Sequence, residues 1–238
     1  MRQTRRFHSK QELTEGKVRI TGEEARHMHV FRLKQGDKVD LFDDLGTIGL
    51  GTIEQIEKES IEIKIDEIQK VRKTGIIKTI ATAVPKGKRF DLLIQKATEL
   101  GADKIIPLIT KRTVVKPRET KIERLKKVAI EAAKQSKQNK IPEITEPVTV
   151  DKLIEMTADY ELKIIASPNA DRTIKEVKQD RKTQKIICLI GPEGGFTNEE
   201  IALAETNNFI PVSLGKEILR TETAGIAVLA MINYEYEN

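Results

Sequence analysis

The sequence predicts an α/β protein in which a domain built on a parallel sheet follows a small β-barrel domain. Short alternating apolar runs punctuated by glycine fill the first part of the chain, and apolar runs alternate with helical patterns after Gly75. Two glycine-bearing turns, residues 190–196 and 214–225, each follow such an apolar run. Because the strands of a parallel sheet end at one edge, we expect both turns to lie where α/β proteins bind small ligands.

The N-terminal part of the chain has the two-residue alternation of half-buried strands. Residues 61–66 alternate strictly between apolar and polar side chains, and residues 39–41 do so briefly. A short helix is expected over residues 23–32, since polar and acidic residues stand where it would begin. We expect three glycine-containing stretches to separate short antiparallel strands of a barrel: residues 36–37, 44–46 and 49–51.

The second domain is expected to begin in the basic stretch 71–74, which divides the chain into residues 1–72 and 73–238. Its expected strands are 76–84, 104–109, 162–166, 185–190 and 210–214. Its expected helices are 90–100, 122–133, 198–207 and 221–235. Thr197 and Glu200 have the spacing of a capping box at the start of the third of these helices. Strands that alternate with helices in this way favour a parallel sheet.

Composition restricts the classes of protein that the chain can belong to. No apolar run approaches the roughly 20 residues that cross a bilayer, and the basic segment 1–6 has no apolar stretch after it. We therefore expect a soluble, cytoplasmic protein with no membrane partner. The single cysteine, Cys188, lies within an apolar run, so we expect a buried thiol. One cysteine excludes an internal disulfide and a Cys-based metal site.

Basic residues concentrate in two zones of the chain. Residues 116–140 hold nine Lys or Arg against three Glu, and residues 1–35 hold nine against four, whereas the whole chain has a net charge of only +5. Either zone alone is equally well explained as a solvated, lysine-rich surface. Together they suggest a polyanion that is contacted at two places. With aromatic residues at 4%, we do not expect base stacking on an aromatic sheet to dominate.

The glycine turns match neither of the common phosphate-binding signatures. Residues 191–195 lack the G-x-G-x-x-G spacing and no P-loop pattern is present, which disfavours a Rossmann dehydrogenase and a P-loop enzyme. Glycines with free backbone amides instead suit an adenosine-type ligand held by main-chain contacts. We interpret residues 46–51 as a hairpin. His27 and His29 lack an obvious third ligand, so we interpret them as RNA-facing or internally bonded histidines rather than as a metal site.

At these turns the sequence resembles the RsmE-type 16S ribosomal RNA uridine-N3 methyltransferases of the SPOUT superfamily. Residues 190–196 and 214–224 are similar to the two cofactor motifs of that family. The resemblance continues through residues 21–25, 32–37, 95–101, 131–136 and 141–142 and so covers nearly the whole chain. It implies a SPOUT-type, trefoil-knotted parallel-sheet domain preceded by a PUA-like β-barrel. It also implies a homodimer that uses S-adenosylmethionine (SAM), requires no metal and acts on 16S rRNA or the small ribosomal subunit near the decoding centre.

Carried onto this chain, the resemblance and the chemistry of methyl transfer indicate the site residues. The uracil N3–H is a weak acid, so a cation beside its oxygens would stabilise the anion, and Arg220 is the candidate. Glu193 would orient the base or accept its proton, or would only stabilise a helix N-terminus. The expected cofactor contacts are Ala166, Ile190, Gly191, Glu193, Gly194, Leu214, Gly215, Ile218, Leu219 and Thr223. The expected RNA contacts are Arg5, Arg6, Arg32, Lys86, Arg89, Arg112 and Lys137.

Two other functions remain open on the sequence. A SPOUT enzyme that methylates a ribose 2′-oxygen would need the same cofactor loops. A non-catalytic RNA-binding factor in ribosome assembly would need only the two basic zones. Binding of the cofactor distinguishes an enzyme from the non-catalytic assembly factor. The position of the methyl group on the nucleotide distinguishes a base methyltransferase from a 2′-O-methyltransferase.

Overall fold

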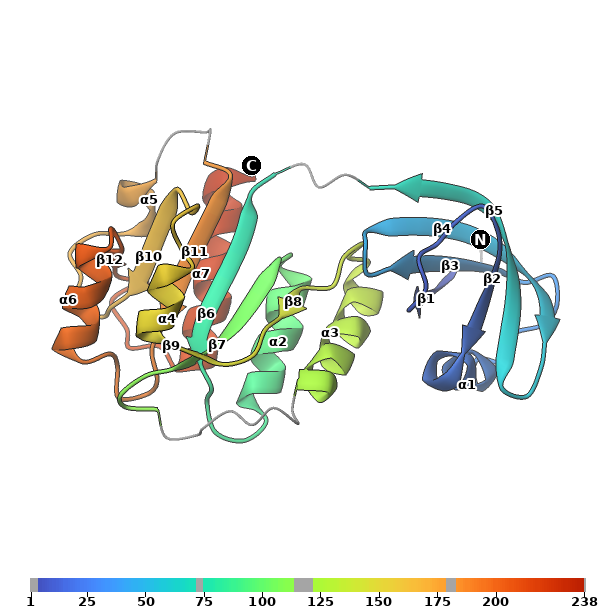
Figure 1. Cartoon of the computed structure of the whole chain (residues 1–238), viewed down its shortest axis with the longest axis horizontal. Coiled ribbons are helices and arrows are strands. Elements are labelled where there is room, and N and C mark those ends of the chain that lie inside the picture. Colours follow the sequence, from blue (N-terminus) through green and yellow to red (C-terminus); the bar gives the residue numbers. More distant parts are fainter. Residues whose placement is uncertain (1–3, 72–74, 114–121, 179–182, 238) are drawn as a thin grey trace. The chain divides into compact units, whose positions relative to one another are not determined.

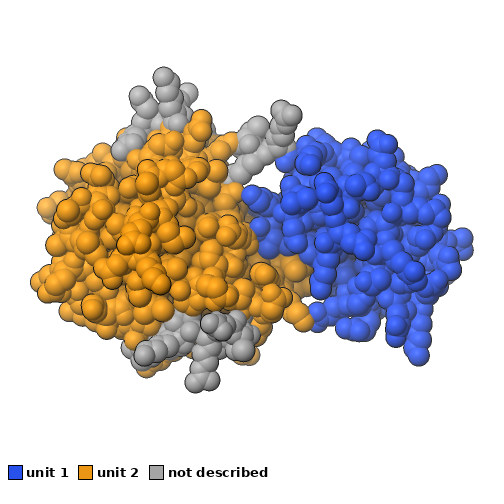
Figure 2. Space-filling model, viewed as in Figure 1, with its two compact units in different colours: residues 1–73, 133–141 blue, residues 74–132, 142–238 orange. Residues whose placement is uncertain are grey.

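The computed structural model describes residues 4–71, 75–113, 122–178 and 183–237 (Figure 1). The chain forms two compact units, one of residues 1–73 with 133–141 and one of residues 74–132 with 142–238 (Figure 2). The predicted boundary between residues 72 and 73 lies outside the described residues. The sequence patterns did not indicate that residues 133–141, most of which belong to the basic zone 116–140, pack with the N-terminal unit.

The first unit is a curled sheet with one helix beside it (Figure 1). Its elements are β1 (Arg5–Ser9), β2 (Gly16–Thr21), α1 (Gly22–Val30), β3 (Lys38–Asp43), β4 (Thr47–Ile56) and β5 (Ser60–Lys70). The strand order is β1-β3-β4-β5-β2, and every pair is antiparallel except β1 with β3, which is parallel. The expectation of a purely antiparallel sheet is therefore wrong at this one edge. Alternate residues of the strands pack with Ala25 and Met28 of α1 in one apolar core.

The glycines of residues 46–51 divide into a turn and a strand. Gly46 has a φ of +83° and lies between β3 and β4, which confirms the hairpin. Gly49 and Gly51 do not end a strand as predicted, because both lie inside β4. A Cβ atom on Gly51 would lie 2.6 Å from Cγ2 of Ile63, so the missing side chain lets β4 approach β5 where the register shifts.

The second unit is built on a parallel sheet. Its strands are β6 (Ile77–Ala83), β7 (Lys104–Ile109), β8 (Glu143–Ile144), β9 (Val148–Thr149), β10 (Leu162–Ala166), β11 (Lys185–Ile190) and β12 (Ile210–Val212). The order is β12-β10-β11-β6-β7-β8, with β9 also paired to β7. The helices are α2 (Arg89–Glu99), α4 (Val150–Glu155), α5 (Ile174–Val177), α6 (Asn198–Thr206) and α7 (Thr221–Tyr236). A further helix, α3 (Ile122–Ser136), starts in this unit, and its last residues count with the first unit.

Both faces of this sheet are covered, so most of its strands are mainly apolar without strict alternation, although β6 also buries Lys78, Thr79 and Thr82. On one face, alternate residues such as Ile187 and Leu189 pack with Leu153 of α4 and Ala204 of α6. On the other face lie α2 and α7, which pack against each other (Figure 1). Cys188 is buried as predicted, and burial raises the pKa of its thiol. No helix in the described part of the chain is long and apolar enough to cross a bilayer.

The path of the chain after β12 positions the C-terminal loops. β12 is an edge strand, whereas α7 packs against β6 and β11 near the middle of the sheet. Residues 213–220 join them and therefore return from the edge toward the carboxyl ends of the central strands (Figure 1). A Cβ atom on Gly225 of α7 would lie 2.9 Å from Leu93 and 3.0 Å from Ile80, so α7 lies unusually close to α2 and β6.

Candidate functional site

The two glycine turns meet at the carboxyl edge of the sheet, as predicted. We call residues 191–197, after β11, the first glycine loop, and residues 213–220, after β12, the second glycine loop. The hydroxyl of Thr221, where the second loop enters α7, donates a 3.0 Å hydrogen bond to the carbonyl oxygen of Gly191. Ala166 ends the intervening strand β10, and the amide of Ser167 donates to the carbonyl of Val212. The carboxyl ends of three neighbouring strands thus form one site.

The first glycine loop is held by its own turn. The amide of Gly195 donates to the carbonyl of Pro192 at 2.8 Å, and Gly195 has a φ of +69°, which glycine adopts without strain. The ring of Phe196 packs on Gly191 so closely that a Cβ atom there would lie 3.1 Å from the ring. The loop has little freedom to change its shape.

Neighbouring segments hold the same loop from outside. Nη1 of Arg112, in the loop after β7, donates to the carbonyl oxygens of Gly194 at 2.6 Å and Phe196 at 3.4 Å. Thr197 and Glu200 form the predicted capping box at the start of α6. The other oxygen of Glu200 accepts the amide of Lys111 at 2.8 Å. The loop after β7 is therefore bonded both to the first glycine loop, through Arg112, and to the start of α6, through Lys111.

Among the described residues, the second glycine loop is bonded near its beginning and where it enters α7, but not between these points. The amide of Ser213 donates to the carbonyl of Arg172 at 2.7 Å, and the hydroxyl of Ser213 donates to the carbonyl of Gly215. Gly215 has a φ of +138°. The side chains of residues 216–218 are exposed, and that of Ile218 is 84% exposed. An apolar side chain that is exposed beside two glycine-bearing loops is available to cover a ligand.

The remaining predicted cofactor residues line these two loops. Ile190 is buried at the end of β11, and Leu214 and Leu219 are half-buried in the second glycine loop. Glu193 and Gly194 are exposed at the tip of the first loop, and Thr223 is exposed in the first turn of α7. The structure therefore gathers all ten predicted residues at one edge of one sheet.

The two predicted catalytic residues differ in their surroundings. Arg220 precedes the first turn of α7, its side chain is exposed, and it makes no ion pair with any described residue. Its donors are thus free to address a substrate. Glu193 instead lies 3.5 Å from Nη1 of Arg89, the first residue of α2.

A third charged residue lies at this edge that the sequence patterns did not indicate. Glu222 lies in the first turn of α7 with a side chain only 8% exposed, and its Oε1 lies 3.8 Å from Nε of Arg89. A signal for it exists, because Glu222 is the only charged residue in the stretch 221–234. A lone acid at the start of an apolar helix is unusual unless it has a partner.

The predicted RNA-binding residues of the first unit fall into two groups. Arg32 and Lys137 are exposed at positive φ, and the guanidinium of Arg5 is exposed above the ring of Phe31 at 3.8 Å. Arg6 is different, because its side chain is 10% exposed and donates to the carbonyls of Lys137 and Gln138. Burial lowers the pKa of Arg6. Its donors hold the unit together, so the structure does not support Arg6 as an RNA contact.

The basic zone of residues 116–140 is less exposed than the sequence indicated. Residues 116, 118 and 121 lie outside the described residues, as does residue 2 of the first zone. Lys134 of this zone is not part of a solvated surface: its side chain is 4% exposed, and its ammonium group donates to Glu24 at 3.1 Å and to Nδ1 of His27 at 3.0 Å. His27 is therefore an internally bonded histidine, as is His29, whose Nε2 lies 3.0 Å from the carbonyl of Glu57.

The predicted RNA contacts of the second unit also differ from one another. Lys86 is exposed in the loop after β6. Arg89 and Arg112 hold the first glycine loop by the contacts described above. Their guanidinium groups therefore already have partners within the unit.

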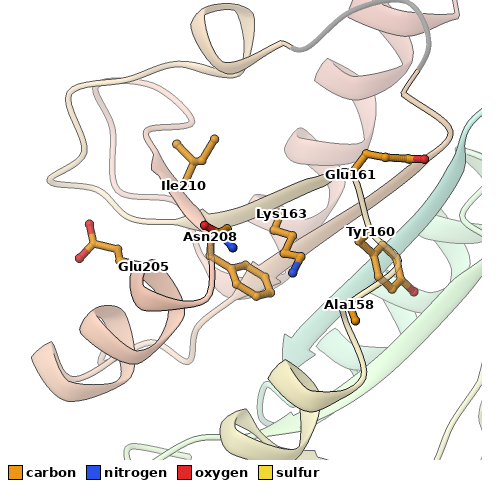
Figure 3. Close-up of a pocket in the computed structure, with 8 residues that line it drawn as sticks. Ala158, Tyr160, Glu161, Lys163, Glu205, Asn208 and Ile210 are labelled. Atoms are coloured by element: carbon orange, nitrogen blue, oxygen red, sulfur yellow. The ribbon is translucent and has the colours of Figure 1, made fainter.

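A pocket of about 550 Å³ lies at the opposite edge of the same sheet (Figure 3). Its lining includes Lys163 and Ile210, near the amino ends of β10 and β12, together with Tyr160 and Phe209. It contains none of the predicted site residues, and its polar side chains do not resemble the glycine-lined loops.

Comparison with known proteins agrees with this arrangement. Residues 72–233 match the family model of an RNA methyltransferase domain, and residues 20–66 match that of an RNA methyltransferase PUA domain. A ribosomal RNA small subunit methyltransferase E from Synechocystis is 33% identical over 227 residues, covering 94% of this chain and 75% of the relative.

Two solved structures are also similar. A putative methyltransferase from Legionella pneumophila in complex with SAM is 32% identical with a TM-score of 0.88, covering 98% of both chains. A ribosomal RNA small subunit methyltransferase E from Neisseria gonorrhoeae bound to SAM is 28% identical with a TM-score of 0.90, again covering 98% of both chains. The first unit is thus PUA-like and the second has the SPOUT-type sheet, as expected. The chain belongs to the RNA methyltransferase family that includes the ribosomal RNA small subunit methyltransferases E.

Proposed function

We propose that this protein transfers a methyl group from SAM to N3 of a uridine in 16S rRNA, near the decoding centre of the small ribosomal subunit. The observation that carries the proposal is the meeting of two glycine loops at the carboxyl edge of the sheet, with the guanidinium of Arg220, which pairs with no described residue, beside them. Two similar structures contain SAM, and the curated relatives act on small-subunit rRNA by name.

The loops fit SAM because they offer backbone donors and apolar cover without side chains in the way. Among the described residues, the amides of Gly194 and Leu214 have no acceptor. A Cβ atom on Gly195 or Gly215 would meet nothing within 4 Å, so space is open beside both turns. Ile190, Leu214 and Ile218 would pack against the adenine, while the other predicted contacts would act mostly through the backbone. When bound, SAM supplies an activated methyl group on a sulfonium.

The residues of the chain orient the uracil base and stabilise the charge that forms on it. Removal of the N3 proton leaves a uracil anion whose charge spreads over O2 and O4, and Arg220 stabilises that charge with paired donors. Glu193 orients the base or accepts the proton. No step requires a metal ion. The target uridine must be unpaired or extruded, since N3 is hidden in a base pair.

The exposed basic residues of both units bind the RNA backbone in this proposal: Arg5, Arg32, Lys86 and Lys137. Lys137→Glu should weaken RNA binding and lower the slope of log affinity against log salt by about one. An unchanged slope, measured by filter binding from low to high salt, would remove Lys137 from the interface.

Three finer features of the family complete the proposal. The segment from the second glycine loop through α7 would thread a trefoil knot, the active form would be a homodimer, and the enzyme would work in the cytoplasm, where ribosomes assemble. Sedimentation of the purified protein tests the dimer directly, and a monomer that remains fully active would refute it.

The decisive experiment uses small ribosomal subunits from a strain that lacks the modification. Incubation with the protein and labelled SAM, followed by nuclease digestion and mass spectrometry, should place one methyl group on uracil N3. A methyl group on a ribose oxygen would identify a 2′-O-methyltransferase. The absence of both transfer and saturable SAM binding by calorimetry would identify a non-catalytic assembly factor.

A further inference from the structure

Glu222 has the features of a residue kept for function rather than for packing. Its side chain is more than nine-tenths buried, and its Oε2 has no hydrogen-bond partner among the described residues. A buried carboxylate is costly unless it is paired. Glu222 stands between Thr221, which binds Gly191 of the first glycine loop, and Thr223, a predicted cofactor contact, and it lies two residues after Arg220.

Arg89 connects Glu222 to the first glycine loop. Its Nε lies 3.8 Å from Oε1 of Glu222, and its Nη1 lies 3.5 Å from Oε1 of Glu193. The three residues come from α7, α2 and the first glycine loop, so the chain of charges joins three separate segments at the carboxyl edge. The planar guanidinium can hold two carboxylates at different nitrogens, which an ammonium group does less well.

The two carboxylates are not equivalent. Glu222 is buried on a long helix, whereas the side chain of Glu193 is 40% exposed on a loop. The buried end is the anchor because burial and the helix restrict its motion, and the exposed end is the part that is oriented. Arg89, whose own side chain is 43% exposed, links the fixed carboxylate of Glu222 to the carboxylate of Glu193.

We propose that Glu222 is a positioning residue for methyl transfer: it fixes Arg89, and Arg89 fixes the carboxylate of Glu193 where that group meets the uracil base. The inference rests on the proposed function and assigns Arg89 to the first glycine loop instead of to RNA phosphates. Glu222 itself touches neither substrate nor cofactor in this account.

The test is a double-mutant cycle with Glu222→Gln and Arg89→Lys, using small ribosomal subunits as substrate. Each single change should lower kcat about 30-fold, because a small misplacement of a reacting group can cost up to about 100-fold. The double variant should be no more than about twofold slower than the slower single variant, since both changes break one unit. The Kd for SAM, measured by calorimetry, should change less than about threefold in all three variants.

Asp91→Asn is the matched control. Asp91 lies on α2 two residues after Arg89, it pairs with Arg124, and its Oδ1 is also buried without a partner in the described residues. This change also breaks an ion pair on the same helix. Because Asp91 pairs with neither Arg89, Glu193 nor Glu222, kcat should stay within about twofold of wild type. A loss as large as that of Glu222→Gln would overturn the inference, because any disturbance of α2 would then suffice.

Two further outcomes would overturn the inference while the proposed function stands. One is a double variant in which the two losses in kcat multiply. The other is a Glu222→Gln variant whose Kd for SAM rises as much as kcat falls, which would make Glu222 a cofactor ligand. A wild-type protein that transfers no methyl group to rRNA would instead refute the proposed function, and this inference with it.

Discussion

The two glycine loops lie at the same edge of one sheet but are held very differently. The first is fixed by its own turn, by two carbonyl contacts from Arg112 and by the capping box of Thr197 and Glu200. The second is bonded at Ser213 and at the start of α7, and the stretch between them carries an apolar side chain, Ile218, that is 84% exposed.

This difference indicates that the two loops have different roles in binding and catalysis. Backbone amides bind a ligand best when their positions are set in advance, since no ordering is then needed on binding. The first loop meets that condition. In the proposed function, the second loop would instead cover the ligand and bring Arg220 to the substrate. Changes in the first loop should therefore affect SAM affinity, and changes in the second should divide between catalysis and affinity.

The largest effect is expected for Arg220→Ala in the second loop. Loss of the guanidinium should lower kcat on the order of 10³-fold, because in the proposed reaction it is the charge that would stabilise the uracil anion. The Kd for SAM should stay nearly unchanged in calorimetry. A variant that keeps substantial activity in a methyl-incorporation assay would refute the role of Arg220.

A smaller effect is expected for Gly195→Ala in the first loop. The positive φ of Gly195 costs a residue with a Cβ about 1–2 kcal/mol, so the loop should distort and the Kd for SAM should rise about 10-fold. Gly16→Ala is the control, since Gly16 has a φ of +105° in the first unit. It should lower the melting temperature without changing the Kd, and equal effects on Kd would refute the prearranged loop.

Arg112→Ala tests what holds the first loop from outside. Two carbonyl contacts are lost, so the Kd for SAM should rise roughly 5-fold. Lys111→Ala should leave the Kd unchanged, because Lys111 contacts Glu200 through its backbone amide. If calorimetry finds normal SAM affinity for Arg112→Ala but RNA binding is weakened, Arg112 is an RNA contact as the sequence alone indicated.

The smallest effect is expected for Ile218→Ala. If the exposed Ile218 covers the adenine only in the bound state, its truncation should raise the Kd for SAM about threefold and leave the melting temperature of the free protein unchanged. Lys216→Ala, in the same exposed stretch, serves as the control. A lower melting temperature for Ile218→Ala would show that the side chain already packs in the free protein.

The sequence predicted the elements that local patterns specify. The bounds of β7, β10 and β11 are those predicted, because strands buried on both faces appear as mainly apolar runs bounded by polar residues or glycine. The capping box at Thr197 and the two glycine turns are equally local signals. The short elements β8, β9, α4 and α5 were missed, since two to six residues contain no periodicity to detect.

The roles of charged residues depended on partners far away in the sequence. Arg6 and Lys134 both appeared to be surface charges, yet their partners lie more than a hundred positions away and bury them. Arg89 is tied to Glu193 and Glu222, which lie on two later segments. Composition and spacing determined the sheet, its ligand-binding edge and the family resemblance, because these follow from periodicity and glycine placement. Only the tertiary structure decided which charges face solvent and which position the site, because a charge takes its role from the groups that folding brings beside it.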